Sequence, residues 1–250
     1  DQVYSVPTGE LLIGMDGKLN PKATLGYSDG TYYYIPDNWS DEIFENNVRQ
    51  EYNLSVSGAS DKMNYYMSAG YLDDQGIVPN SGFQRYSARL KADYQVKPWL
   101  KLGANVSFTH YDSREQDTEG GTSNANIFYA SNIMGAIYPM YIRDAQGNIM
   151  TDNRGFQRYD YGKKGQDTNG SRNTIPNANP LASYMLDKMK YSGDVVSGKW
   201  FADVDIWGGI KAKVNIGVDA NNVRNTDMVN PFYGQYSETT GAVSYTHLTL

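Results

Sequence analysis

The feature that most constrains this chain is a strict alternation of apolar and polar residues between Gln50 and Tyr111. Four segments of this stretch read as β-strands in two hairpins, and every second side chain in them is apolar. The clearest sets are Tyr52, Leu54 and Val56; Tyr86, Ala88, Leu90, Ala92 and Tyr94; and Leu100, Leu102, Ala104, Val106 and Phe108. Because successive side chains of a strand point to opposite sides, each strand has one apolar face and one polar face.

Two all-β structures show this alternation, the transmembrane β-barrel and the soluble β-sandwich. The strands here run to about ten residues or more, whereas globular strands usually have about five or six. Short turns, such as 60–62, alternate with long connections, such as 112–194, as in barrels with short periplasmic turns and long outer loops. Charged residues on the polar face, such as Arg85 and Asp93, suit either structure. The pattern favours the barrel and leaves the sandwich open.

Composition excludes several classes of protein. The chain has 250 residues, enough for one or two domains, and contains no run of about 20 apolar residues that could form a membrane-spanning helix. The net charge of −6 argues against a nucleic-acid partner. Cysteine is absent, so no disulfide framework or thiolate metal site is expected. The 22 tyrosines fit the aromatic girdles of a barrel.

The alternation divides the chain into three expected parts. Residues 1–49 are expected to form an extracellular loop that enters the barrel, because Pro7, Pro21 and Pro36 interrupt any regular element. Residues 50–242 are expected to form a barrel segment with a long loop at 113–194. Residues 243–250 resemble translated adapter sequence, and whether they are native stays open. No signal peptide precedes Asp1, so we expect either a removed signal or an internal piece of a longer protein.

Three short helices are expected outside the strands. Residues 37–44 should form one or two helical turns with Trp39, Ile43 and Phe44 on the buried side, packing loop against barrel wall. Within the long loop, a helix should begin at Ser123 and end before Pro139. A second should run from Pro180 to about Lys188, with Asn179 as its cap and Pro180 in the first position.

Candidate substrate contacts lie in the long loop. Tyr159, Tyr161 and Arg158 stand together in a polar stretch. Aromatic faces beside hydrogen-bonding side chains suit a sugar ring, and they suit a peptide equally well. The alternative is that these side chains only pack within the loop.

Two further strands are expected at 195–207 and 210–220, joined by Gly208 and Gly209. Their alternation would place Asp203 and Asp205 opposite Lys211 and Lys213, as cross-strand ion pairs on the lumen face. We therefore interpret these acids as structural rather than catalytic.

No other chemistry is indicated. The chain has two histidines, His110 and His247, which cannot build a zinc site or a catalytic triad. It contains no phosphate-binding loop motif. The sequence predicts no enzyme activity, no cofactor and no metal.

A set of short segments carries a resemblance to a known family, in the following order: Trp39–Phe44, Gln50–Gly58, Tyr65–Ile77, Phe83–Tyr86, Trp99–Ser107, Tyr159–Gly162 and Asn179–Ala182. In sequence, order and spacing, these segments resemble the early barrel of SusC/RagA-type TonB-linked outer-membrane transporters. The resemblance extends to about Ala242 and makes the barrel interpretation the preferred one.

The resemblance implies a function beyond what the residues show. Members form large barrels closed by a plug, with about 22 strands in plugged transporters. They import oligosaccharides or peptides across the bacterial outer membrane. A SusD-like surface lipoprotein covers the outside, and TonB supplies energy through a TonB box and plug, neither of which we recognise in this sequence. The expected partners are therefore that lipoprotein, TonB, outer-membrane lipid and the substrate, whose identity the sequence does not give.

Two other functions share the alternation. A passive porin or adhesion-type barrel would need neither plug nor lipoprotein. A soluble all-β glycan-binding module would close its apolar faces into a core.

Overall fold

The computed structural model describes residues 3–115, 126–162, 172–175, 178–228 and 243–249. It divides the chain into two compact units, each assembled from separate stretches of sequence. We call residues 46–116, 188–228 and 243–250 the sheet unit, and residues 1–45, 117–187 and 229–242 the loop unit. The described parts of each unit are treated separately below.

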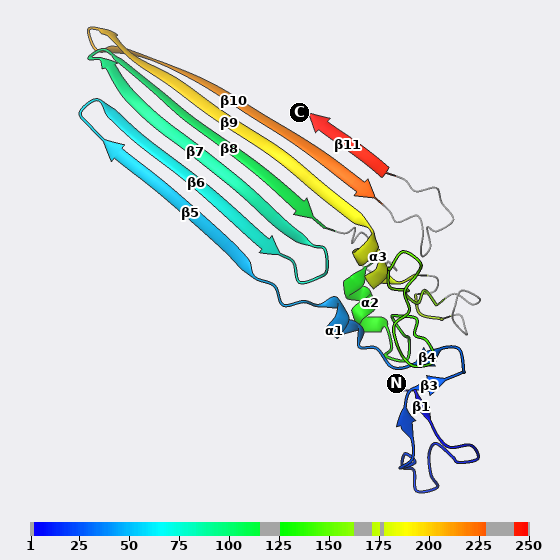
Figure 1. Ribbon diagram of the computed structural model, residues 1–250. Coiled ribbons are helices and arrows are strands. Elements are labelled where there is room, and N and C mark those ends of the chain that lie inside the picture. Colours follow the sequence, from blue (N-terminus) through cyan, green and yellow to red (C-terminus); the bar gives the residue numbers. More distant parts are fainter. Residues whose placement is uncertain (1–2, 116–125, 163–171, 176–177, 229–242, 250) are drawn as a thin grey trace. The chain divides into compact units, whose positions relative to one another are not determined.

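The sheet unit is an antiparallel meander in which every strand pairs with its neighbours in sequence (Figure 1). Its described strands are β5 (Arg49–Ala59), β6 (Met63–Gln75), β7 (Gly82–Lys97), β8 (Leu100–Arg114), β9 (Lys188–Trp207), β10 (Ile210–Met228) and β11 (Val243–Thr249). The order across the sheet is β11-β10-β9-β8-β7-β6-β5. Neighbouring strands therefore exchange backbone hydrogen bonds along the whole ladder.

The register aligns like residues across the strands. Leu54 lies opposite Ala69, Ala69 opposite Ala88, and Ala88 opposite Phe108. One residue further along, Asn53 lies opposite Gly70, which in turn lies opposite Ser87. The apolar rows and the polar rows therefore continue from strand to strand on opposite faces, which we call the apolar face and the polar face.

No described residues bury the apolar face. Leu54 is 71% exposed, Leu90 46%, Leu102 42% and Val214 56%. In a soluble sandwich these side chains would form a closed core. Their exposure is what a barrel wall facing lipid requires.

The tight turns all join the same ends of the strands. β9 and β10 are joined by Gly208 and Gly209, whose φ angles are +60° and +83°. Two successive residues with positive φ form the hairpin turn that matches strand twist, and glycine adopts them without strain. The hairpins β5–β6 and β7–β8 also close over few residues at this end.

Two strands are longer than the alternation predicts. β9 begins at Lys188 rather than 195, so the expected loop at 113–194 ends earlier, and β10 continues to Met228 rather than 220. In the added part of β9, Lys188, Lys190 and Ser192 occupy the positions that are apolar further along the strand. Because every second residue of this extension is polar rather than apolar, the sequence shows no alternation there and does not predict the strand.

The loop unit is built from short elements. It contains β1 (Tyr4–Ser5), β2 (Thr24–Leu25), β3 (Tyr27–Ser28) and β4 (Tyr33–Tyr34), and three helices, α1 (Trp39–Ile43), α2 (Ile127–Ile133) and α3 (Pro180–Leu186). Its core includes Trp39, Ile43, Ile127, Met140 and Leu181, each at most 2% exposed. Residues before β5 and residues between β8 and β9 thus share one core, rather than forming separate loops. Among the described residues, no helix is long and apolar enough to cross a membrane.

Asparagine side chains begin all three helices. Asn38, Asn126 and Asn179 each accept a hydrogen bond from a backbone amide of the first turn. The prediction for α3 is confirmed, including Pro180 at the start. The described helix α2 begins after its cap Asn126, whereas the expected start at Ser123 lies outside the described residues. The prediction that Phe44 is buried is wrong. It follows the last residue of α1 and is 38% exposed, with its ring 5.9 Å from that of Phe128.

The two faces of β8 can be compared directly by substitution in the full-length protein. Val106 lies in the apolar row beside Leu90, and the next residue, Ser107, lies in the polar row beside Arg89. Val106→Arg should destabilise the barrel by about 2–4 kcal/mol if the site lies near the middle of the bilayer. Ser107→Arg should cost much less, because its face is wet. Folding into lipid vesicles measures both, and equal penalties would refute the assignment of faces.

Candidate functional site

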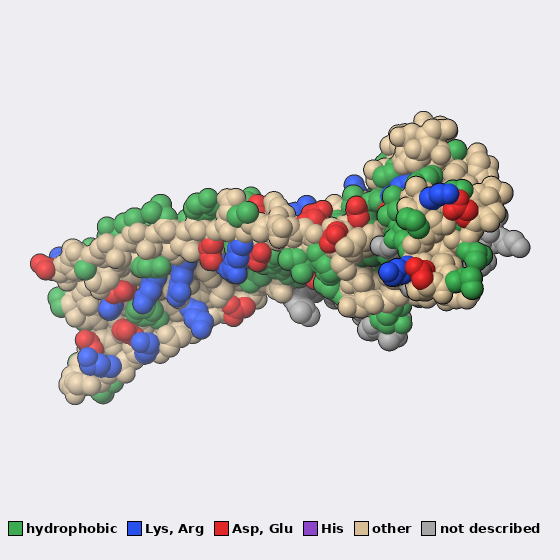
Figure 2. Space-filling view, turned by 90° about the horizontal axis from the view of Figure 1, so that it is seen from below, with side chains coloured by type: hydrophobic (Ala, Val, Ile, Leu, Met, Phe, Trp, Pro, Cys, Tyr) green, Lys and Arg blue, Asp and Glu red, His purple; other side chains and the backbone are tan. Residues whose placement is uncertain are grey.

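The polar face of the sheet carries most of the charge of the sheet unit, and Figure 2 shows basic and acidic side chains gathered on one face. The basic residues on this face include Arg85, Arg89, Lys91, Lys101, Lys199, Lys211 and Lys213, and the acidic ones Glu51, Asp93, Asp203, Asp205 and Asp219. A solute passing along this wall would therefore meet charged and hydroxyl groups rather than hydrocarbon.

Cross-strand ion pairs order part of this face. Lys213 lies 3.3 Å from Asp203 and Lys211 lies 3.2 Å from Asp205, as the alternation predicts. Lys101 pairs with Asp93 at 2.8 Å. These pairs explain the acids without catalysis.

A depression of about 420 Å³ lies on the polar face near the tight turns. Its charged lining consists of Lys101, Asp203, Asp205, Lys211 and Lys213. Nearer the middle of the strands, Arg89 donates to Asn105 at 3.0 Å, and Arg89 makes no ion pair within the described part of the sheet. This part of the wall therefore offers a hydrogen-bonding surface with net positive charge.

The loop unit is held together by a nearly buried ion pair. Asp37, just before α1, accepts two hydrogen bonds from the Arg143 guanidinium, at 2.7 and 3.1 Å. Both side chains are close to 10% exposed, and Asp37 also accepts from the Met140 amide at 2.7 Å. The pair links two chain segments separated by 106 residues.

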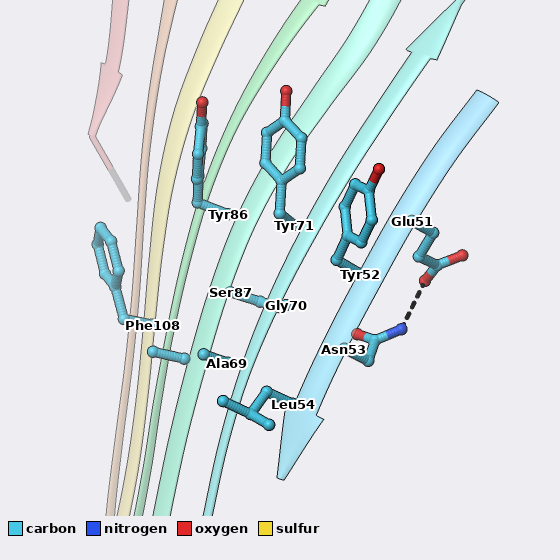
Figure 3. A pocket seen from close by; sticks show the side chains of 11 residues that line it. Glu51, Tyr52, Asn53, Leu54, Ala69, Gly70, Tyr71, Tyr86, Ser87 and Phe108 are labelled. Atoms are coloured by element: carbon cyan, nitrogen blue, oxygen red, sulfur yellow. Dashed lines mark hydrogen bonds between the residues drawn. The ribbon is translucent and has the colours of Figure 1, made fainter. Parts of the chain in front are cut away.

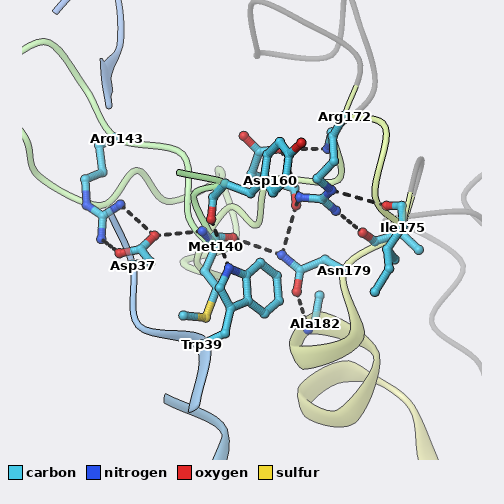
Figure 4. Close-up of polar contacts among 12 residues, drawn as sticks. Asp37, Trp39, Met140, Arg143, Asp160, Arg172, Ile175, Asn179 and Ala182 are labelled. Carbon is cyan, nitrogen blue, oxygen red and sulfur yellow. Dashed lines mark hydrogen bonds and ion pairs between the residues drawn. The ribbon is translucent and has the colours of Figure 1, made fainter. Parts of the chain in front are cut away.

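A second polar cluster surrounds the start of α3 (Figure 4). The Asn179 side chain is completely buried and donates to the carbonyls of Met140 and Asp160, at 3.0 and 2.9 Å. Arg172, which is 4% exposed, donates to the carbonyls of Ile175, Asp160 and Ala178. These bonds satisfy polar groups that would be costly to bury alone.

Burial changes the ionisation of this cluster. It raises the pKa of the Asp160 carboxyl, although the Gly162 amide and the Arg172 guanidinium favour its charged form. It also lowers the pKa of Arg172. The charged atoms of the two side chains lie 3.9 Å apart.

The predicted substrate residues lie beside this core. Tyr159 is 7% exposed, and its ring centre is 5.3 Å from that of Tyr141, whose hydroxyl donates to Glu42 at 3.3 Å. Burial raises the pKa of both tyrosines. Arg158 and Tyr161 are half-buried. Substrate contact by these three residues stays a prediction.

The sequence does not indicate the role of Arg143 or Arg172. Each is an isolated arginine in a stretch without periodicity, and the groups that it contacts are defined only by the fold. Asn179 was identified as a helix cap, but not as the donor that joins two other loop segments. In the described ranges, no group of three or more histidine, aspartate or glutamate side chains could hold a metal ion.

A sheet with one exposed apolar face and one charged face is the wall of a transmembrane barrel, and comparison with known proteins identifies the type. SusC, a TonB-dependent receptor of Bacteroides thetaiotaomicron, is 33% identical over 88 residues, which are 35% of this chain and 9% of SusC. The TonB-dependent receptor P3 of Formosa agariphila is 24% identical over 225 residues, or 84% of this chain and 20% of P3. The chain thus spans a fifth or less of these relatives. No family model matches it.

Solved structures of the RagAB peptide transporter share the fold. One matches 82% of this chain and 21% of its own, with a TM-score of 0.61 and 24% identity. The closed-closed state of the RagAB peptide importer matches 88% of this chain with a TM-score of 0.60. The predicted resemblance to SusC/RagA-type TonB-dependent transporters is confirmed, and the sheet is a segment of a large antiparallel transmembrane β-barrel.

Removing one partner of the buried ion pair should open the loop unit. Asp37→Asn leaves the Arg143 charge without its carboxylate, and it should lower the free energy of local unfolding by about 3 kcal/mol. Amide hydrogen exchange in the full-length protein measures this. Glu10→Gln is the control, because it removes an exposed ion pair with Lys22 and should leave exchange unchanged. Equal protection of both variants would contradict the role of Asp37.

The raised pKa of Asp160 predicts how stability varies with pH. The folded state holds this proton more tightly than the unfolded chain, in which the carboxyl has its ordinary value of 3.8. The associated stability is complete below that value and is lost as pH rises through the raised pKa. Asp160→Asn should remove this contribution. Amide hydrogen exchange of the loop unit, measured from below pH 3.8 to above the raised pKa, tests this prediction. A variant with the same pH profile of stability as wild type would contradict it.

Proposed function

We propose that this chain is part of an outer-membrane, TonB-dependent active transporter that imports oligosaccharides or peptides beneath a SusD-like lipoprotein. The observation that carries the proposal is the sheet itself, which presents an uncovered apolar face and a continuous charged face in one register. Its relatives SusC and P3 are TonB-dependent receptors, and a solved structure of the same fold is a peptide transporter. The sheet contributes the wall, and the energy coupling requires parts of the protein outside this chain.

The loop unit supports a role at the outer mouth. Residues 3–45 precede β5 and residues 178–187 precede β9 in sequence, both at strand ends opposite the tight turns, where the outer loops of such barrels lie. Its buried polar clusters make it an ordered structure rather than an open loop. We propose that it presents a fixed surface to the substrate or the lipoprotein, with Tyr161 and Arg158 as contacts and Tyr159 packed behind them.

Energy dependence separates this proposal from the passive porin. In cells that carry the full-length protein, uptake of labelled oligosaccharides or peptides should fall to the level of a transporter-deletion strain when TonB is removed. A porin would continue uptake without TonB and would conduct ions in planar bilayers. Uptake that does not change on loss of TonB would refute the proposal. Comparing the two substrate libraries in the same assay would then identify the substrate class.

A further inference from the structure

The apolar face ends, towards the loops, in a row of neighbouring aromatic rings. Tyr52, Tyr71, Tyr86 and His110 lie opposite one another on β5 to β8, with ring centres 6.4, 5.0 and 6.4 Å apart. Aromatic rings of this kind mark the boundary between hydrocarbon and headgroups in membrane proteins. We call this set the tyrosine row.

Beyond the tyrosine row, the same face is charged. On β8 the residues that continue the alternation are Asp112 and Arg114. On β9, Asp194 lies opposite His110, and Ser192 and Lys190 continue beyond it. His110 Nδ1 lies 2.7 Å from Asp194, and Lys190 lies 3.1 Å from Asp112. The contacts show that these side chains share the outward face of the sheet, not the lumen.

Two cations in this group have no carboxylate partner among the described residues. Arg114 lies opposite Lys190, and Arg224 of β10 lies opposite Ser192. Both are exposed, whereas Asp112 and Asp194 are already paired with Lys190 and His110. The charged residues on the outward face from the tyrosine row towards the loops are the basic Arg114, Lys188, Lys190 and Arg224 and the acidic Asp73, Asp112 and Asp194. Positive charge is therefore in slight excess at the level where lipid headgroups begin.

A hollow of about 690 Å³ lies on the same face directly below the tyrosine row (Figure 3). Ala69 and the residue opposite it, Ala88, line its floor. Figure 3 shows Leu54 and Phe108 on either side and the tyrosine rings above. Small side chains between large ones leave space for hydrocarbon on a face that is already apolar. Phe108 and Arg114 lie six residues apart on β8, so the hollow and the cations are roughly 20 Å apart along the strand.

We propose that this outward face binds a phosphorylated glycolipid of the outer leaflet, with phosphate against Arg114, Lys190 and Arg224 and an acyl chain in the hollow over Ala69 and Ala88. Arginine binds phosphate with paired, charge-assisted hydrogen bonds, and cations beside a membrane attract anionic headgroups. A lipid with several acyl chains spans the distance between the two features. The inference rests on the outer-membrane location in the proposed function.

Lipid A tests the phosphate contact. The full-length transporter, purified in detergent, is titrated with bisphosphorylated lipid A and with dephosphorylated lipid A, and bound lipid is counted by native mass spectrometry. Wild type should prefer the phosphorylated form. The double variant Arg114→Gln and Arg224→Gln should bind it about tenfold more weakly, while Arg114→Lys and Arg224→Lys should retain most of the binding.

The control removes equal charge from the other face of the same sheet. Arg89→Gln with Lys199→Gln should leave lipid A binding unchanged, because these side chains face the lumen. Equal loss in both double variants, or no preference for phosphate in wild type, would overturn the proposal. Failure of the lipid site can be told apart from failure of the membrane location. If Val106→Arg is tolerated as well as Ser107→Arg, the sheet does not face lipid and the proposed function itself is wrong.

Discussion

The structure depends on the continuous antiparallel pairing of the strands from β5 to β10, whose register shifts only beside the tight turns at Gln95–Lys97 and Ile210–Lys211. In lipid, a backbone amide or carbonyl has no water to bind, so every group within the bilayer must find a partner on a neighbouring strand. The ladder also fixes register, and a slip of one residue would exchange the two faces. Opposite Leu54, Ala69 and Ala88 keep the outside apolar, while Asn53, Gly70 and Ser87 stay on the wet side. One set of backbone hydrogen bonds thus determines both which side chains face the membrane and which face the solute.

The two faces differ in how they use polar residues. On the lumen side, charges such as Lys213 and Asp203 pair across strands, which keeps the wall hydrated without leaving many single charges. On the outward side, polar residues begin at the tyrosine row, where Asp194 lies opposite His110, and continue beyond it in Asp112 and Arg224. The same strands therefore have three zones along their length: the tight turns, the membrane-facing band and an extension beyond it.

Sequence alone predicted the strands of the membrane band, because a period of two is visible wherever one face must be apolar. It missed the first part of β9 and the last part of β10, where both faces are polar and the period carries no signal. It predicted the asparagine cap of α3, a local effect, and misjudged Phe44, whose burial depends on where a five-residue helix ends. The contact of Asp37 with Arg143 could not be predicted, because nothing local relates residues so far apart.

The ion pair between Asp37 and Arg143 also has a consequence for the order of assembly. Strands β5 to β8 lie between the two residues in sequence, so Asp37 emerges during synthesis well before its partner. Until that intervening chain has been delivered, the first segment of the loop unit has no core to join, and Trp39 and Ile43 remain without most of their burial. A chaperone that shields the early segment would therefore be most valuable during this interval, and completion of the ion pair would mark its end.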